Sequence, residues 1–185
     1  TTGNDTAAIQ DLAGNDAASF TNTVVADGYI RGATVYIDVN QNGVIDIGTD
    51  YLVGTTDANG NVLIPGGAPA GSIIATGGVN TDTGAPNTMV LKAPQGAATI
   101  NPLTTLVQAV IEKAVAANPN TVVNAALIAQ ASTKVADSLG LTSSLGGASL
   151  LNYDPIAKGD TVVQKAAAQV ATIVTLAGNA EAGTT

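Results

Sequence analysis

The chain has 185 residues, which suits one ordinary domain or two small ones, and its apolar residues, 45% of the total, suffice for a real core. It contains no Cys and no His, which removes thiol nucleophiles, disulfides, the usual transition-metal ligands and the commonest acid–base group, and so argues against an enzyme. The net charge of -8 disfavours nucleic acid and favours divalent cations, and no apolar run reaches the roughly 20 residues of a membrane-spanning helix.

The first half of the chain is acidic and is predicted to form β-strands. Residues 1–91 contain nine acidic residues and one basic residue, Arg31. Residues 1–22 are small and polar, which predicts a linker or a loosely held strand. Beyond them, Gly, Pro, Asn and Asp separate short runs rich in β-branched residues, a pattern typical of strands. The predicted strands are 33–37, 51–55, 61–64, 72–75, 88–91 and 97–100. In the first of these, Val35 and Ile37 share one face, as in a half-buried antiparallel strand.

The second half of the chain is predicted to be helical, because from Asn101 onward the apolar period changes from two residues to 3.6. Apolar residues such as Leu106 and Val110 then recur at three- and four-residue spacing, and we expect this stripe to be buried. A flexible link is expected at 142–149. The signals that begin three helices are Asn101-Pro102, Asn118-Pro119 and Asp160, and those that end the second and third are Gly140 and Gly178.

These patterns predict an α+β fold. A small antiparallel β-sandwich-like unit with a cation-binding loop occupies residues 23–100, and a three-helix unit packed against it occupies residues 101–178. Residues 179–185 are expected to form a frayed tail.

One stretch carries a recognisable chemical pattern, Asp38-Val-Asn40-Gln-Asn42-Gly43-Val44-Ile-Asp46. It places oxygen-bearing side chains at positions 1, 3, 5 and 9 of an EF-hand-type loop, glycine at position 6 and a backbone carbonyl, that of Val44, at position 7. Alternate side chains converge as such a loop curls around a cation, and hard oxygen ligands suit calcium. Without an ion, Asn42-Gly43 would form a hairpin turn from the same residues.

The ligand at position 12 of the loop is open, because Thr49 stands where an EF-hand loop has a bidentate Glu. Asp50, one residue later, would close the site through a shifted backbone. Asp57, in the turn signal Asn59-Gly60, or Asp27 would reach in from a neighbouring turn, or else the site is weak. The candidate metal ligands are therefore Asp38, Asn40, Asn42, Val44, Asp46, Asp50 and Asp57.

The loop lies within a longer motif, Val-x-Asp-Gly-Tyr-Ile-x-Gly-Ala-x-Val-x-x-Asp-x-Asn-x-Asn-Gly over residues 25–43, followed by Thr-Thr-Asp-Ala-Asn-Gly-Asn over residues 55–61. It resembles the calcium-loaded B-type repeats and carboxypeptidase-regulatory-like β-sandwiches of large bacterial surface adhesins. Segments 98–107, 152–157 and 163–170 resemble the helical continuation beside that unit in exoproteins secreted by type I systems.

The resemblance implies calcium binding by the first loop, a hairpin at the second motif, and work as a stalk, spacer or adhesive module. It places the protein outside the cell, secreted or on the cell surface. The partners it implies are calcium, neighbouring modules of the same long chain, and a surface glycan or protein.

Other functions fit the sequence less simply. A glycosidase needs two carboxylates about 5 to 10 Å apart, and the loop acids are explained more simply as calcium ligands. Lys92 is the one strand lysine that could form a Lys–Asn crosslink. The main alternative is a module that binds a glycan, peptide or partner subunit in a groove between the β and helical units. The aromatic residues expected to line such a groove are Tyr29, Tyr51 and Tyr153.

Overall fold

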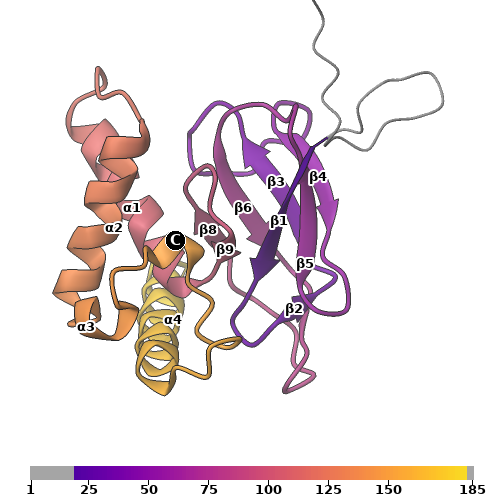
Figure 1. Ribbon diagram of the computed structural model, residues 1–185. Helices are drawn as coiled ribbons and strands as arrows, with labels where there is room; N and C mark the ends of the chain where they lie inside the picture. The colour runs from indigo at the N-terminus through magenta and orange to yellow at the C-terminus, as the bar shows by residue number, and fades with distance from the viewer. Residues whose placement is uncertain (1–18, 183–185) are drawn as a thin grey trace, which may run out of the picture.

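The structure, a computed structural model, describes residues 19–182 and confirms the α+β class: strands occupy the first part of the described chain and helices the second. The helices lie together on one side of the sheets (Figure 1). The predicted linker and frayed tail lie partly outside the described residues. Residues 20–22 of that linker are already part of the first strand.

Nine strands are found in the described residues, arranged in three sheets with the orders β5-β1-β9, β2-β7 and β4-β3-β6-β8. All neighbouring strands are antiparallel except β1 and β9, which are parallel. The strands are β1 (Phe20–Val25), β2 (Ile30–Arg31), β3 (Thr34–Asp38), β4 (Tyr51–Thr55), β5 (Asn61–Pro65), β6 (Ser72–Thr76), β7 (Val79–Asn80), β8 (Leu91–Ala93) and β9 (Thr99–Ile100).

The predicted alternation in β3 is confirmed, since Val35 and Ile37 are buried while Thr34 and Tyr36 are partly exposed. Strands β3 to β6 match their predicted ranges within one residue at each end. The last two predicted strands differ from the structure. Strand β8 shares only residue 91 with the predicted range 88–91 and continues to residue 93, and β9 is shorter than predicted because residues 97–98 lie outside it.

The helices follow directly from β9. They are α1 (Pro102–Ala117), α2 (Ala125–Ser138), the single-turn α3 (Thr142–Leu145), the 3-10 helix η1 (Leu150–Asn152) and α4 (Thr161–Ala182). Asn101 caps α1 as predicted, since its side chain accepts the Thr104 N–H at 2.9 Å. Asp160 caps α4 by accepting the N–H groups of Val162 and Val163 at 3.0 and 3.1 Å.

Three helix boundaries differ from the predictions. Helix α2 begins after Asn124, whose side chain accepts the Leu127 N–H at 3.0 Å, so the turn at Asn118-Pro119 ends α1 without starting α2. The expected flexible link at 142–149 contains α3. Helix α4 continues through Gly178, since glycine inside a helix costs only about 1 kcal/mol relative to alanine.

Helix α1 joins the two halves, because its first turn packs on β8. The Thr105 hydroxyl accepts the Lys92 N–H at 2.9 Å, and the Thr104 hydroxyl donates to the Lys92 carbonyl at 2.9 Å. One hydrophobic cluster runs from the sheets into α1, α2 and α4, and the most buried residues of the α1 stripe are Leu103, Val107 and Ile111. Leu106 and Val110, expected in the core, are only partly buried at its margin.

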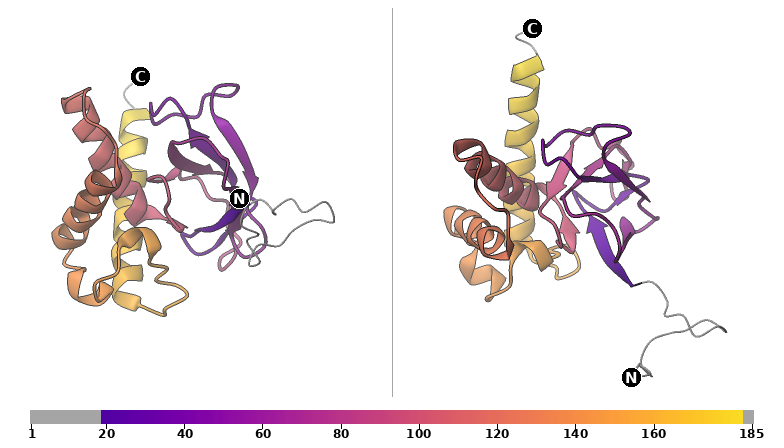
Figure 2. Two further views of the ribbon diagram at one scale, coloured as in Figure 1. Left: turned by 45° about the horizontal axis from the view of Figure 1, so that its top comes forward. Right: turned by 90° about the horizontal axis from the view of Figure 1, so that it is seen from above.

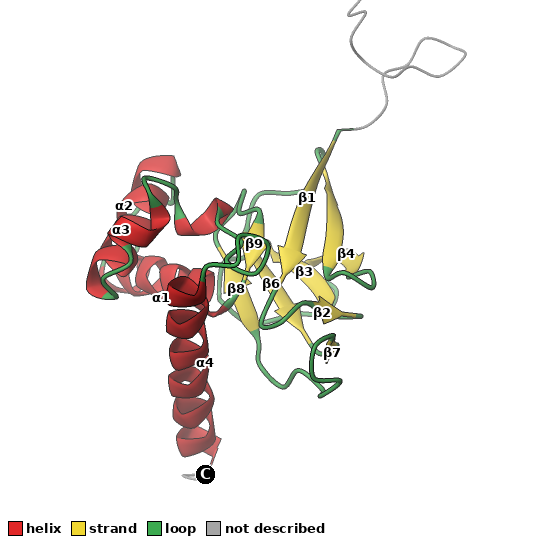
Figure 3. Ribbon diagram, turned by 60° about the horizontal axis from the view of Figure 1, so that its bottom comes forward, coloured by secondary structure: helices red, strands yellow, loops and turns green. Residues whose placement is uncertain are grey.

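Helix α4 contacts α1, and its C-terminal part projects away from the body of the molecule, as the right view of Figure 2 and Figure 3 show. Its buried contacts come from Val163 and Val170. None of the helices within residues 19–182 combines the length and hydropathy that crossing a membrane requires.

Candidate functional site

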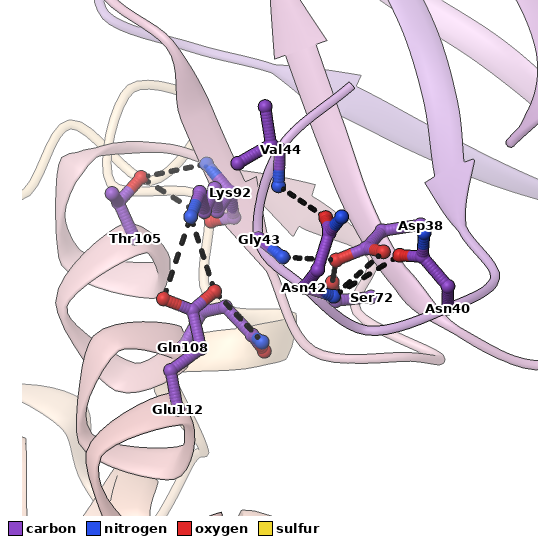
Figure 4. A network of polar contacts seen from close by, with 10 residues as sticks. All are labelled: Asp38, Asn40, Asn42, Gly43, Val44, Ser72, Lys92, Thr105, Gln108 and Glu112. Carbon is purple, nitrogen blue, oxygen red and sulfur yellow. Dashed lines mark hydrogen bonds and ion pairs between the residues drawn. The ribbon is translucent and has the colours of Figure 1, made fainter. Parts of the chain in front are cut away.

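The predicted loop connects β3 to β4, and Asp38, the last residue of β3, is fixed at its base. Asp38 is 1% exposed. One carboxylate oxygen accepts the Asn42 N–H at 3.2 Å, and the other accepts the Gly43 N–H at 2.8 Å and the Ser72 hydroxyl at 3.2 Å (Figure 4). Three donors, two from the loop and one from β6, therefore hold this buried carboxylate.

The amides of Asn40 and Asn42 converge on the Asp46 carboxylate. Their Nδ2 atoms donate to the same Asp46 oxygen at 2.9 and 2.6 Å. These two hydrogen bonds, that from Asn40 first, lower the pKa of Asp46 below its ordinary value. The alternate spacing of the three residues thus brings their side chains to one point, as the sequence predicted.

Local hydrogen bonds explain why the backbone curls here. Asn40 and Asn42 each accept an N–H two residues ahead, from Asn42 at 3.2 Å and from Val44 at 2.8 Å. Gly43 has φ of 78°, the left-handed conformation predicted for position 6 of the loop, and Gln41 has φ of 56°. Asn and Gly at these positions therefore shape the loop through local hydrogen bonds and left-handed backbone.

Asp50 ties the two ends of the loop together. Its carboxylate accepts the Val39 N–H at 3.0 Å and the Asp46 N–H at 2.7 Å, one on each oxygen. Its own N–H donates to the Asp46 carbonyl at 2.9 Å. Among the candidates for the missing position-12 ligand, Asp50 is thus the one that the structure places in the loop, where it acts as a clamp on the backbone.

The structure does not bring Asp57 or Asp27 to the loop. Asp57 lies in the turn after β4, at the end of that strand away from Asp50, and accepts the N–H groups of Asn59 and Asn61 at 2.8 Å each. These bonds, that from Asn61 first, lower its pKa. Asp27 lies between β1 and β2, where Asn80 donates to its carbonyl, and burial raises its pKa. Asp57 serves the hairpin turn.

The loop residues fit a hard cation in type. Among the side chains that the structure describes, those of residues 19–175, no cluster of three or more His, Cys, Asp or Glu suited to a metal is found, so the oxygens would come largely from Asn and the backbone. Turning the amides of Asn40 and Asn42 about their terminal torsions would exchange Nδ2 for Oδ1 and direct oxygens toward the Asp46 carboxylate. This change would break the hydrogen bonds that the two Oδ1 atoms accept from the N–H groups of Asn42 and Val44, so it requires the loop backbone to adjust as well. A cation would then replace the hydrogen bonds that Asp46 now accepts.

An ion pair from outside the loop lies against Gly43. Lys92 Nζ of β8 is 3.1 Å from Glu112 Oε1 of α1, and Gln108 donates to the same oxygen at 3.3 Å (Figure 4). A methyl group on Gly43 would lie 2.9 Å from Lys92 Nζ and 3.2 Å from Glu112 Oε1. The ammonium considered for a crosslink is thus paired with a carboxylate. Sequence reasoning missed this contact because no local signal links residue 43 to residues 92 and 112.

A groove of about 400 Å³ separates the loop from the helices, at the junction where a binding site was considered. None of the three tyrosines expected there lines it. The Tyr29 hydroxyl donates to Asp154 at 2.9 Å, and the Tyr153 hydroxyl donates to Asp160 at 2.7 Å, so both are used within the protein. The lining comes from loop residues 41–42, residues 70–72 and 94–95, one face of α1 and residue 123.

The fold and the loop define an α+β protein whose polar Asp/Asn loop sits at the junction of sheet and helices. Comparison with known protein families, curated proteins and solved structures finds no match to this chain. Its function is therefore inferred from the loop and the junction.

Proposed function

We propose that this protein is a non-catalytic, calcium-stabilised module with a structural or adhesive role in a large secreted bacterial cell-surface protein. The observation that carries the proposal is the convergence of Asn40, Asn42 and Asp46 beside the buried Asp38. Calcium takes six to eight oxygen ligands in flexible geometry, so it tolerates a set built from carboxylates, amides and a carbonyl.

In this proposal each loop residue has a definite task. Asp46 supplies the exposed charge that attracts the ion, Asn40 and Asn42 supply amide oxygens, and Val44 supplies its carbonyl. Asp38 supplies a carboxylate already oriented by the N–H groups that it accepts. Asp50 holds the two ends of the loop at the spacing that the ligands need. Asp57 is left out of the ligand set, because its carboxylate is used in the turn.

A small number of carboxylates suits an extracellular role. Calcium sites of extracellular modules have dissociation constants of about 10⁻⁴ to 10⁻³ M, weaker than the charge-rich sites of intracellular sensors. Such a site fills outside the cell and stays empty inside it. The ion would then stabilise the module only after export, by binding the folded state.

Calorimetric titration of calcium into the wild-type protein and into Asp46→Asn tests the proposal. We expect the wild type to bind in the submillimolar to millimolar range and D46N to bind at least about tenfold more weakly, because a charge-assisted ligand is lost. Asp57→Asn is the matched control: it removes the same charge from a turn outside the loop and should bind like the wild type. Absence of binding to the wild type at about 10 mM, or equal losses in D46N and D57N, would contradict the proposal.

A second candidate function is recognition of a partner in the groove, favoured by the position of that groove between loop and helices. Its lining combines the aliphatic side chains of Ile111, Val115 and Val123 with polar side chains, among them the amides of Gln41, Gln95 and Gln108 and the Glu112 carboxylate, which is paired with Lys92. Such a lining suits a neutral peptide with one aliphatic side chain. Titration of labelled protein with N-acetyl-leucine methylamide should shift the resonances of the groove residues alone. No shift at tens of millimolar would remove this candidate.

A further inference from the structure

The Lys92–Glu112 pair is the one ion pair found among the side chains that the structure describes. Both groups are partly shielded, with side-chain exposures of 19% and 32%, and Glu112 receives the additional hydrogen bond from Gln108. Lys92 comes from β8 and Glu112 from α1, so the pair joins the sheet to the helical unit at the loop.

The pair and the candidate ligands lie on opposite sides of a single glycine. The Gly43 N–H is 2.8 Å from the Asp38 carboxylate, and a methyl group on the same residue would be 2.9 Å from Lys92 Nζ. The ammonium therefore lies within one Debye length of the loop, which is about 10 Å at 0.1 M salt. At this separation its charge acts on any ion held in the loop.

We infer that Lys92 and Glu112 act on the calcium affinity of the loop from outside the ligand set, with opposite signs that their pairing balances; this inference rests on the proposed calcium site. Lys92 repels a divalent cation and Glu112 attracts it, and the two effects nearly cancel because the charges are 3.1 Å apart. Removing either partner leaves the other charge uncompensated beside Gly43. The affinity should then move in opposite directions for the two changes.

The left-handed backbone is what favours glycine at position 43. An added methyl group would also press on the ends of the Lys92 and Glu112 side chains, which can shift aside. Because residue 43 has no side chain, nothing from it separates the loop from the Lys92–Glu112 pair, and the charges of the pair act on an ion bound in the loop.

The test is a charge cycle measured by calorimetric calcium titration in low and high salt. Lys92→Met should tighten binding about threefold and Glu112→Gln should weaken it about threefold, the size expected for one charge acting on a divalent ion through partly solvated surroundings. The double variant K92M/E112Q should bind like the wild type. The shifts should shrink as salt rises, because the interaction is screened.

Two remote variants control for net charge: Lys134→Met on α2 and Asp82→Asn in the loop after β7, both at exposed positions. They should leave the affinity unchanged. Circular dichroism in chelator verifies that each variant is folded, and Lys92→Gln replaces K92M if the latter is not. Shifts of the same sign in K92M and E112Q, no shift in either, or shifts equal to those of the remote controls would overturn the inference while leaving a calcium-binding wild type intact. A wild type that binds no calcium would overturn the proposed function and, with it, the inference.

Discussion

Adding calcium should raise the melting temperature of the protein. The size of the rise can be estimated from the number and type of ligands in the loop. The loop offers two carboxylates, two amides and one carbonyl, with Asp50 already engaged by two N–H groups. This set corresponds to weak extracellular sites, with dissociation constants of about 10⁻⁴ to 10⁻³ M. At about 10 mM calcium, mass action then stabilises the folded state by about 1.4 to 2.7 kcal/mol. For a chain of this size that is a rise of about 3 to 11 °C.

The measurement is a pair of thermal melts, followed by circular dichroism, in about 10 mM calcium and in chelator. Asp46→Asn should show a smaller rise, because binding about tenfold weaker reduces the stabilisation at about 10 mM calcium to about 0.4 to 1.4 kcal/mol. Asp38→Ala should lose the calcium effect and should in addition melt lower in chelator. The Gly43 N–H and the buried Ser72 hydroxyl lose their acceptor in this variant, and a buried group left without a partner costs about 1 to 3 kcal/mol. Identical wild-type curves with and without calcium would refute the reasoning.

Three further outcomes follow from the structure. In urea unfolding, Leu103→Ala should cost about 2 to 5 kcal/mol because Leu103 is 1% exposed, and Leu106→Ala clearly less; equal losses would contradict the observed burial. The hydrogen bond from Tyr153, with those from the first turn of α4, lowers the pKa of Asp160 in the folded protein. Ionised Asp160 therefore stabilises the folded state at pH values above its unfolded pKa of about 3.9, and this stabilisation is lost as the pH falls through the lower folded pKa. Asp160→Asn should therefore lose less stability than the wild type between about pH 5 and pH 2.5, as urea midpoints would reveal. Chelation of calcium should speed hydrogen exchange in residues 103–115 as well as in the loop, and unchanged exchange in α1 would mean two independent units.

The features that the sequence predicted correctly depend on interactions between residues that lie close together in the chain. The alternation in β3 and the Asn101-Pro102 cap depend on neighbours one to four positions away, and both are confirmed. The sequence predicted no strand at 23–25 and left residues 20–22 open between a linker and a loosely held strand, because Phe20 to Asn22 carry no apolar alternation and are exposed. They are in a strand because β5, about forty residues later, pairs with them antiparallel.

In the candidate site, too, the local geometry was predictable from sequence, and the contacts between distant residues were not. The spacing of Asn40, Asn42 and Asp46 predicted the convergence that the hydrogen bonds now describe, since it depends on the curl of one loop. The clamp formed by Asp50 depends on where β4 begins relative to β3, and the ion pair on Gly43 depends on how α1 returns to the sheet. Neither geometry is encoded locally.

The helical unit is attached to the sheet by buried side chains, which would become exposed to solvent if the two were separated. Helix α1 contacts β8 and β9 as well as α2 and α4, so separation of the halves would remove part of the burial of Leu103, Val107 and Ile111. Each such side chain is worth about 1.5 to 3 kcal/mol when fully buried. Separation would also leave the backbone groups of Lys92 without the threonine hydroxyls of α1 and would break the ion pair beside Gly43. An ion that stabilises the loop therefore also stabilises the contact of the loop with Lys92 and Glu112, to which α1 contributes. For this reason we expect the loop and the helices to respond to calcium together, although their sequence patterns suggest separate domains.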